Sequence, residues 1–217
     1  MYVASPEGQT GKSAVALGLL DALTREVGSV GVFRPLANTS AGVDLIVDLL
    51  VHQPGIHQTY EEALGVSYEA ARENADEAMH VIVQRFGELS ERFSVLLVLG
   101  SDYTDVSTGT ELSFNARIAA NLGSPVVLVV HGRDRTPQQV LTAAEGAVTE
   151  LQAHHARTVA VIANRVDGQA VADIKKELRA IPDVVVAAIG DNPVLSAPTV
   201  RSLAAAVDAP LVQGTDS

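Results

Sequence analysis

Two uninterrupted aliphatic runs, Val95–Leu99 and Val126–Val130, stand in the middle of the sequence. Neither run alternates with polar residues, so neither suits a sheet that has one face in water. Strands that are apolar on both faces are typical of a parallel sheet with helices on both sides. Aliphatic side chains alone can fill such a core, and aromatic residues make up only 4% of this chain.

Shorter apolar runs alternate along the chain with segments of helical periodicity. The further strands are expected at Tyr2–Ser5, Ser29–Arg34, Thr158–Ala163 and Val184–Ile189. The helices are expected at Gly11–Val27, Val43–Leu50, Tyr68–Arg92, Leu112–Leu122, Pro137–Gln152, Gly168–Ala180 and Thr199–Val207. Strict alternation of strand and helix predicts a three-layer α/β/α fold with a mostly parallel sheet. Ligands then bind beyond the carboxyl ends of the strands.

The segment after the first strand reads Ser-Pro-Glu-Gly-Gln-Thr-Gly-Lys-Ser and opens a helix. This context predicts a P-loop, in which backbone amides and the positive end of the helix surround a phosphate. Lys12 would reach the β- and γ-phosphates, and the Ser13 hydroxyl would bind Mg²⁺. The strict pattern has glycine where Pro6 stands. The expected nucleotide contacts in this loop are Gly8, Gln9, Thr10, Gly11, Lys12 and Ser13, within a P-loop NTPase-like fold.

Charged residues follow the second and third strands. Arg34, which precedes Pro35, has the group that grips a carboxylate or phosphate, although a solvent-facing charge is an equal alternative. The third strand contains no acid, and Asp102 comes directly after it. Asp102 would reach Mg²⁺ through a water molecule, or would cap a turn.

The ends of the last two strands carry the candidates for recognition of a base. Asn164 and Arg165 follow the fifth strand, and the Asn amide can pair with the N6/N7 edge of adenine. Residues 190–193 follow the sixth strand and would flank the same base. Ordinary turns are the alternative in both places.

The net charge of −11 excludes several classes of partner. An acidic surface repels phosphate backbones and anionic lipids, so we expect no nucleic acid and no membrane partner. The chain has no cysteine, which excludes disulfides and thiolate metal sites. No leader and no apolar run of about 18 residues is visible, which predicts a cytoplasmic protein.

Together, the segments Val3–Ser13, Val32–Leu36 and Ile162–Val166 resemble the dethiobiotin synthetase branch of P-loop proteins. Two further stretches, Gly100–Val106 and Pro193–Val200, resemble the N-terminal domain of the multidomain bacterial phosphate acetyltransferases. The full enzymes of that family transfer an acetyl group between coenzyme A and phosphate, with the catalytic domain at the C-terminus.

This resemblance implies a division of the chain at residue 195. Residues 1–195 would be the P-loop, dethiobiotin synthetase-like domain, and residues 196–217 the truncated start of a DRTGG-type middle module or a linker. The implied role is regulation by a nucleotide (ATP or ADP with Mg²⁺) or metabolite effector. The partners would be the rest of the transferase chain and other subunits of a homo-oligomer, and no residue here would catalyse acetyl transfer.

Three departures from the dethiobiotin synthetases favour sensing over turnover. Ser5 replaces their first loop glycine, Arg34 their lysine, and Leu99 the acid near the end of the third strand. Loss of that acid removes stabilisation of a transition state without preventing binding. Two alternatives stay open: a stand-alone ATP-dependent carboligase, and an ATP-dependent dimerisation module. The second alternative usually carries another lysine early in the loop, which this chain lacks.

Overall fold

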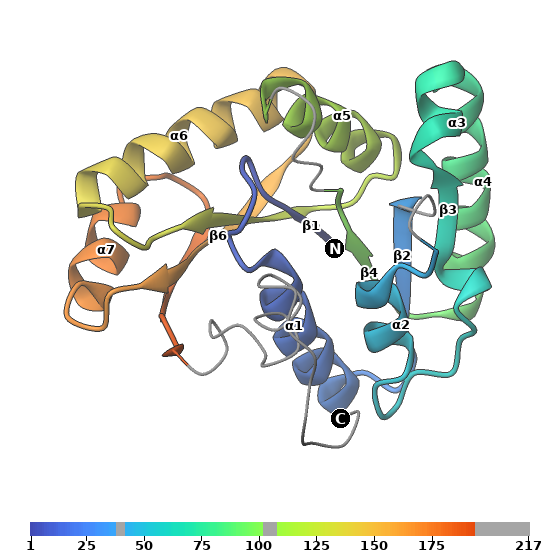
Figure 1. The fold of residues 1–217 in the computed structure, drawn as a ribbon, viewed down its shortest axis with the longest axis horizontal. Helices are drawn as coiled ribbons and strands as arrows, with labels where there is room; N and C mark the ends of the chain where they lie inside the picture. The colour runs from blue at the N-terminus through green and yellow to red at the C-terminus, as the bar shows by residue number, and fades with distance from the viewer. Residues whose placement is uncertain (38–41, 102–107, 194–217) are drawn as a thin grey trace, which may run out of the picture.

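The structure is a computed structural model that describes residues 1–37, 42–101 and 108–193. Seven strands form one sheet in the order β3-β2-β4-β1-β5-β6-β7, and every neighbouring pair is parallel (Figure 1). The strands are β1 (Tyr2–Ala4), β2 (Val30–Ala37), β3 (Leu64–Ser67), β4 (Val95–Leu99), β5 (Val126–His131), β6 (Thr158–Val166) and β7 (Val185–Gly190). The expected helix Thr199–Val207 and the expected module at 196–217 lie outside the described residues.

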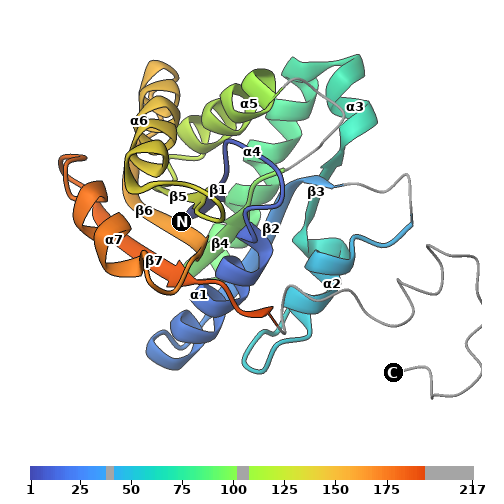
Figure 2. The ribbon, with the colours of Figure 1, turned by 60° about the vertical axis from the view of Figure 1, so that its left-hand side comes forward.

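Helices cover both faces of the sheet, which confirms the predicted three layers (Figure 2). Helices α1 and α2 pack on one face, and α4, α5, α6 and α7 pack on the other. The helices are α1 (Lys12–Glu26), α2 (Leu45–Val51), α3 (Tyr68–Glu73), α4 (Ala75–Arg92), α5 (Thr108–Asn121), α6 (Pro137–Ala153) and α7 (Val171–Leu178), with a 3₁₀ turn at Glu61–Ala63.

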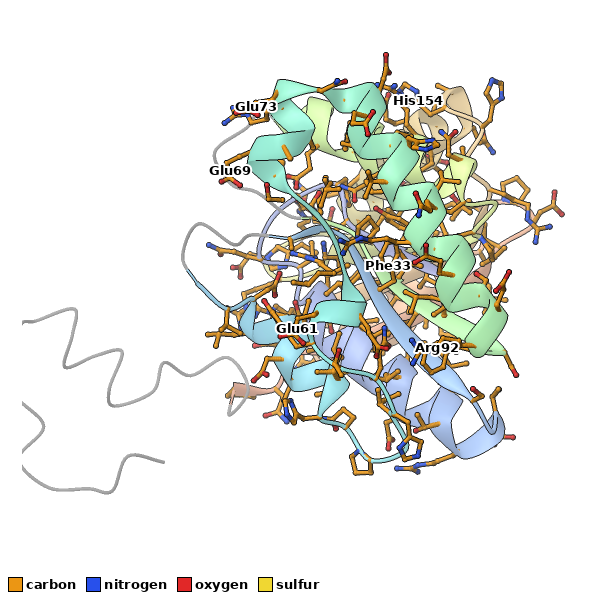
Figure 3. The ribbon with its side chains drawn as sticks, turned by 90° about the vertical axis from the view of Figure 1, so that its right-hand side faces the viewer. Phe33, Glu61, Glu69, Glu73, Arg92 and His154 are labelled. Atoms are coloured by element: carbon orange, nitrogen blue, oxygen red, sulfur yellow. The ribbon has the colours of Figure 1, made fainter. Side chains whose placement is uncertain are left out.

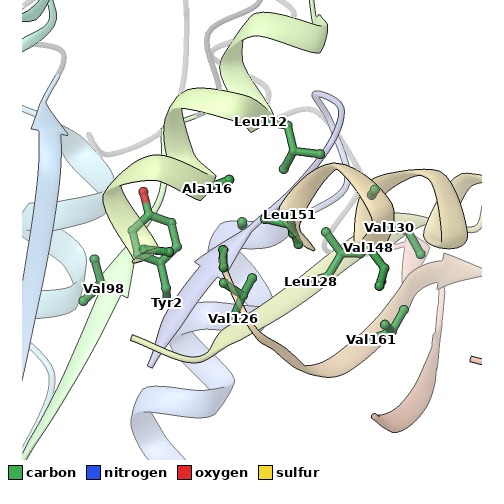
Figure 4. Packing of buried hydrophobic residues seen from close by; sticks show 14 of the residues in the cluster. Tyr2, Val98, Leu112, Ala116, Val126, Leu128, Val130, Val148, Leu151 and Val161 are labelled. Atoms are coloured by element: carbon green, nitrogen blue, oxygen red, sulfur yellow. The ribbon is translucent and has the colours of Figure 1, made fainter. Parts of the chain in front are cut away.

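The continuous apolar runs are divided between the two faces. In β5, Val126, Leu128 and Val130 enter the core under α5 and α6, whereas Val127 and Val129 enter the core under α1 and α2. Figure 4 shows the first of these cores, where Tyr2 lies beside α5. Because successive strand residues point to opposite faces, only a strand covered on both sides is apolar throughout.

The structure differs from the sequence-based expectation at three elements. β3 was not expected, since its four residues contain no long apolar run. The expected helix 68–92 is interrupted at Asn74, whose backbone is extended and whose side chain accepts a hydrogen bond from the Glu77 amide to cap α4. Helix α5 begins at Thr108, four residues before the expected start.

The β3 edge of the sheet, with α3 and α4 outside it, faces the viewer in Figure 3. Phe33 of β2 packs against Phe86 of α4, with ring centroids 6.1 Å apart. The exposed carboxylates of Glu61, Glu69 and Glu73 lie on this side, in keeping with the acidic composition. In the described part of the chain, none of the helices combines the length and apolar character needed to cross a membrane.

Candidate functional site

The loop between β1 and α1 curls back on itself at the carboxyl edge of the sheet. Gln9 and Gly11 both have left-handed backbones, with φ of 58° and 75°. The Ser5 hydroxyl lies 2.7 Å from the Glu7 carbonyl oxygen and 3.1 Å from the Thr10 hydroxyl, which closes the loop. Left-handed residues of this kind bend a backbone into a concavity lined by amides. Gly11 is the N-cap of α1 and makes no side-chain hydrogen bond to the first turn. The amides of that turn therefore need another acceptor.

Lys12 is directed inward from the first position of α1. Only 2% of the residue is exposed, and its ammonium donates hydrogen bonds to the carbonyl oxygens of Gly100 and, at 2.8 Å, of Ser101. These carbonyls follow the last residue of β4. The lysine is therefore held between the loop and the end of the central strand, where it does not extend into solvent.

Arg34, on β2, also contacts the Gly100 carbonyl oxygen that Lys12 contacts. Its Nη1 donates to the Gly100 oxygen at 2.5 Å, and its Nε lies 3.3 Å from the Asp44 carboxylate. Asp44 in turn accepts from the amides of Ile46 and Val47 and caps α2. The structure thus brings Lys12 and Arg34 together at one carbonyl, and it adds Asp44, which the sequence reasoning missed. An anion-binding role for Arg34 stays a prediction.

Asn164 touches the loop from the carboxyl-terminal half of β6. Its Nδ2 donates to the Thr10 carbonyl oxygen at 2.7 Å. A Cβ atom on Gly11 would lie 2.4 Å from the same Nδ2, so a glycine is required there. Asn164 therefore fixes the loop with one N–H of Nδ2, and its second N–H and its Oδ1 are the groups that could contact a base.

A pocket of about 440 Å³ opens between α1 and the ends of β6 and β7. It is lined mainly by apolar groups, together with the polar side chains of Asn164, Arg165, Asp191 and Asn192. Its lining consists of Gly11, Ala14, Val15, Gly18, Leu19, Ile162, Asn164, Arg165, Ile189, Gly190, Asp191 and Asn192. The two expected base-flanking segments and the loop glycine therefore meet in one cavity.

The remaining predicted residues are placed as follows. Ser13 is half-buried in the first turn of α1, Gly8 is half-buried, Gln9 is exposed and Thr10 is buried. Asp102 lies outside the described residues. Within residues 1–37, 42–101 and 108–193, three or more histidine and carboxylate side chains never come together as a metal site. The metal role of Ser13 and Asp102 stays a prediction.

Ion pairs from the segment after β5 border the loop, and sequence reasoning did not find them. Arg135 binds both carboxylate oxygens of Glu7, at 2.6 and 2.7 Å. Arg133 binds Asp191 at 2.5 Å, next to the pocket. Burial lowers the pKa of the His131 imidazole, and the Glu7 carboxylate raises that pKa by a smaller amount.

A buried polar network supports the end of β4 from the opposite side. The Tyr2 hydroxyl donates to Asn115 Oδ1 at 2.6 Å, and the Ser101 amide donates to the same oxygen at 3.0 Å. Burial raises the pKa of the Tyr2 hydroxyl well above its ordinary range, so it remains a donor. Helix α5 thereby fixes the backbone whose carbonyls hold Lys12.

Comparison with protein families gives a match over residues 1–199 to the family described as an AAA domain. Two curated relatives are phosphate acetyltransferases. The one from Nitratidesulfovibrio vulgaris is 30% identical over 172 residues, covering 76% of this chain and 24% of the relative. The one from Synechocystis sp. is 24% identical over 226 residues, covering 100% of this chain and 32% of the relative. The chain thus spans about a quarter to a third of these relatives' length.

Solved structures with a similar fold are P-loop NTPases. Chloroplast FtsY from Physcomitrella patens has a TM-score of 0.60 at 16% identity, covering 88% of this chain and 57% of that one. The cell-division protein MinD from Aquifex aeolicus has a TM-score of 0.55 at 18% identity, covering 90% and 83%. A putative plasmid partition protein from Borrelia burgdorferi bound to AMPPNP gives 0.55 at 15% identity, covering 89% and 87%. These likenesses confirm the predicted fold class.

Proposed function

The chain belongs to the AAA-domain family that matches residues 1–199, and from this premise we propose that it is a nucleotide-sensing regulatory domain of a phosphate acetyltransferase. The acetyl transfer itself would belong to another part of a longer enzyme, because this chain spans at most 32% of the relatives it matches. Assembly with the rest of that enzyme, and into a homo-oligomer, is part of the proposal.

One observation carries the proposal: Gly11, in the curled loop, lines the 440 Å³ pocket, and the buried Lys12 directly follows it. The pocket begins at Gly11, where the first-turn amides of α1 begin. Phosphates placed at that helix end would meet the amides and the lysine. The nucleoside would then extend into the apolar cavity, which has a volume of the size that holds small ligands.

The polar side chains in the pocket lining suit a purine with an exocyclic amino group. One N–H of Asn164 Nδ2 holds the Thr10 carbonyl, and the Asn164 Oδ1 would accept a hydrogen bond from the adenine N6 amino group. Arg165 and the segment 190–192 border the same space. We therefore propose ATP or ADP as the bound nucleotide.

Binding without turnover is favoured by the end of β4. Leu99 is buried in the apolar core under α1 and α2, and the next carbonyl, that of Gly100, accepts from both Lys12 and Arg34. A Mg²⁺ ion bound to the nucleotide would neutralise phosphate charge, and the Ser13 hydroxyl is the described group that would hold it.

Calorimetry of ATP, ADP and NADH binding to the chain tests the proposal. We expect Lys12→Ala to weaken ATP and ADP binding by about 100-fold, since a charge-assisted contact is lost. Lys175→Ala removes the same charge from the exposed face of α7 and serves as the matched control. Absence of any binding at millimolar nucleotide, or equal binding by Lys12→Ala, would contradict the proposal.

The two alternatives predict different measurements. An ATP-dependent carboligase would turn over ATP only when a small carboxylate substrate is supplied. A dimerisation module would change its oligomeric state when ATP is added. We expect neither behaviour from this chain, and light scattering and a phosphate-release assay on the same sample distinguish the three functions.

A further inference from the structure

Glu7 places a carboxylate in the middle of the loop that is proposed to bind phosphate. It is the third residue of the segment that begins at Ser5, and Gly11 and Lys12 follow it closely. A negative charge in this place opposes the binding of an anion. Its side chain is 27% exposed, so water screens that charge only in part.

Arg135 meets this carboxylate with both terminal nitrogens of its guanidinium. Nη1 donates to Oε1 at 2.6 Å and Nη2 donates to Oε2 at 2.7 Å. The backbone amide of His131 also donates to Oε1, at 3.3 Å. The pKa of Arg135 is raised, chiefly by its hydrogen bond to Glu7. A two-point contact of this kind fixes the plane of the carboxylate as well as its position.

The guanidinium is itself held by a rigid part of the fold. Arg135 Nη1 also donates to the His131 carbonyl oxygen, at 3.2 Å, where β5 ends. Thr136, the next residue, begins α6 with a reciprocal capping box formed with Gln139. Arg135 therefore lies between a central strand and a capped helix, both of which restrict its movement.

Two anchors thus hold the loop, one on each side of its turn. Arg135 holds Glu7, and Asn164 of β6 holds the Thr10 carbonyl. The short segment between these anchors contains Gly8 and Gln9, two of the expected phosphate contacts. Its path is consequently set by residues that lie more than 120 positions away in the sequence.

We propose that Arg135 is a positioning residue of the phosphate loop, which cancels the charge of Glu7 and holds the loop in the form that accepts an oxyanion. This inference rests on the proposed nucleotide function. It assigns Arg135 no contact with the ligand. Its effect passes through Glu7, and for that reason the two residues must respond to mutation in different ways.

The test measures ADP affinity for Glu7→Gln, Arg135→Gln and the double variant. Arg135→Gln leaves an uncompensated carboxylate in the loop, and we expect at least about a tenfold loss of affinity. Glu7→Gln removes the charge itself and should change affinity by less than about threefold. The double variant should bind better than Arg135→Gln alone, and the defect of Arg135→Gln should shrink as salt is raised.

Two further variants complete the design. Arg135→Lys keeps the charge without the two-point contact and should recover part of the affinity. Arg25→Gln breaks an exposed ion pair with Asp21 on α1, 2.7 Å long, and controls for the loss of one positive charge. It should bind ADP as the unaltered chain does.

Several outcomes would overturn the inference. Equal losses in Glu7→Gln and Arg135→Gln, with no recovery in the double variant, would reduce the pair to a structural contact. Unchanged affinity in Arg135→Gln would remove its role altogether. If the unaltered chain binds no ADP, the proposed function fails, and hydrogen exchange of the amides in residues 5–11 decides the inference separately. Exchange there must rise in Arg135→Gln and stay constant in Arg25→Gln.

Discussion

Gly11 is the single residue on which the geometry of the candidate site depends most directly. Its backbone φ is 75°, and the nearest atom to a Cβ placed there is Asn164 Nδ2, at 2.4 Å. A side chain at this position would cost free energy in two ways, because the backbone is left-handed and because Asn164 would be displaced. Glycine avoids both, which is why the start of α1 can approach the end of β6.

We expect Gly11→Ala to lower the free energy of unfolding by about 2–3 kcal/mol, from the left-handed conformation and the broken hydrogen bond to Thr10. Chemical denaturation measures this loss. Gly146→Ala is the matched control, since a Cβ on that glycine of α6 meets no atom within 4 Å and should stabilise the helix. Adding Asn164→Ala to Gly11→Ala should cost less than the sum of the two single changes, whereas full additivity would contradict the proposed clash.

Local sequence patterns place single residues of the candidate site in the fold, and the ligand contacts expected of these residues stay predictions. Gly11 and Lys12 lie between β1 and the first turn of α1, as the loop spacing predicts. Asn164 was expected just after a strand that ends at Ala163, and it lies instead within β6, which continues to Val166. Glu7 and Arg135 could not be paired in this way, because 128 positions separate them and no local spacing relates them. Asp44 was missed for a related reason, since its partner Arg34 lies on a different element.

At the scale of elements, the same distinction separates predictable from unpredictable structure. β4 and β5 were predicted because burial on both faces leaves a continuous apolar run. β3 and the break at Asn74 were not, since a four-residue edge strand and a capping side chain depend on neighbouring elements. Hydrophobic periodicity predicts which faces of an element are buried more reliably than it predicts where the element begins and ends.

The contact between α5 and the end of β4 yields a prediction about the stability of the site. Asn115 is fully buried and serves both the Tyr2 hydroxyl and the Ser101 amide. We expect Asn115→Leu to lower the free energy of unfolding by about 3 kcal/mol, because two buried donors lose their acceptor. Tyr2→Phe removes one donor and leaves the other bond intact, so it should cost only about 1 kcal/mol. Urea denaturation of both variants checks the order, and equal costs would contradict this account.

At the scale of the whole molecule, the sheet separates two apolar cores, and each core supports a different part of the candidate site. The core under α4, α5, α6 and α7 holds Tyr2 and Asn115, which support the end of β4. The core under α1 and α2 lies on the face that carries the loop helix and the pocket. The candidate site at the carboxyl edge of the sheet collects residues from β2, β5, β6 and β7, from the segments that follow β1 and β4, and from the start of α1.

We proposed that this chain senses a nucleotide and that another part of a longer enzyme transfers the acetyl group. This proposal leads to a prediction about the chain assayed by itself. The proposal assigns the holding of phosphates to the groups at the carboxyl edge, and it assigns acyl transfer to another part of the enzyme. We therefore expect no acetyl-CoA above the uncatalysed level when the chain is mixed with acetyl phosphate and coenzyme A. The phosphate acetyltransferase of Nitratidesulfovibrio vulgaris, assayed at the same molar concentration, is the positive control. Turnover that depends on the chain and disappears in Lys12→Ala would place acyl transfer at this loop and would refute the assignment of a sensing role.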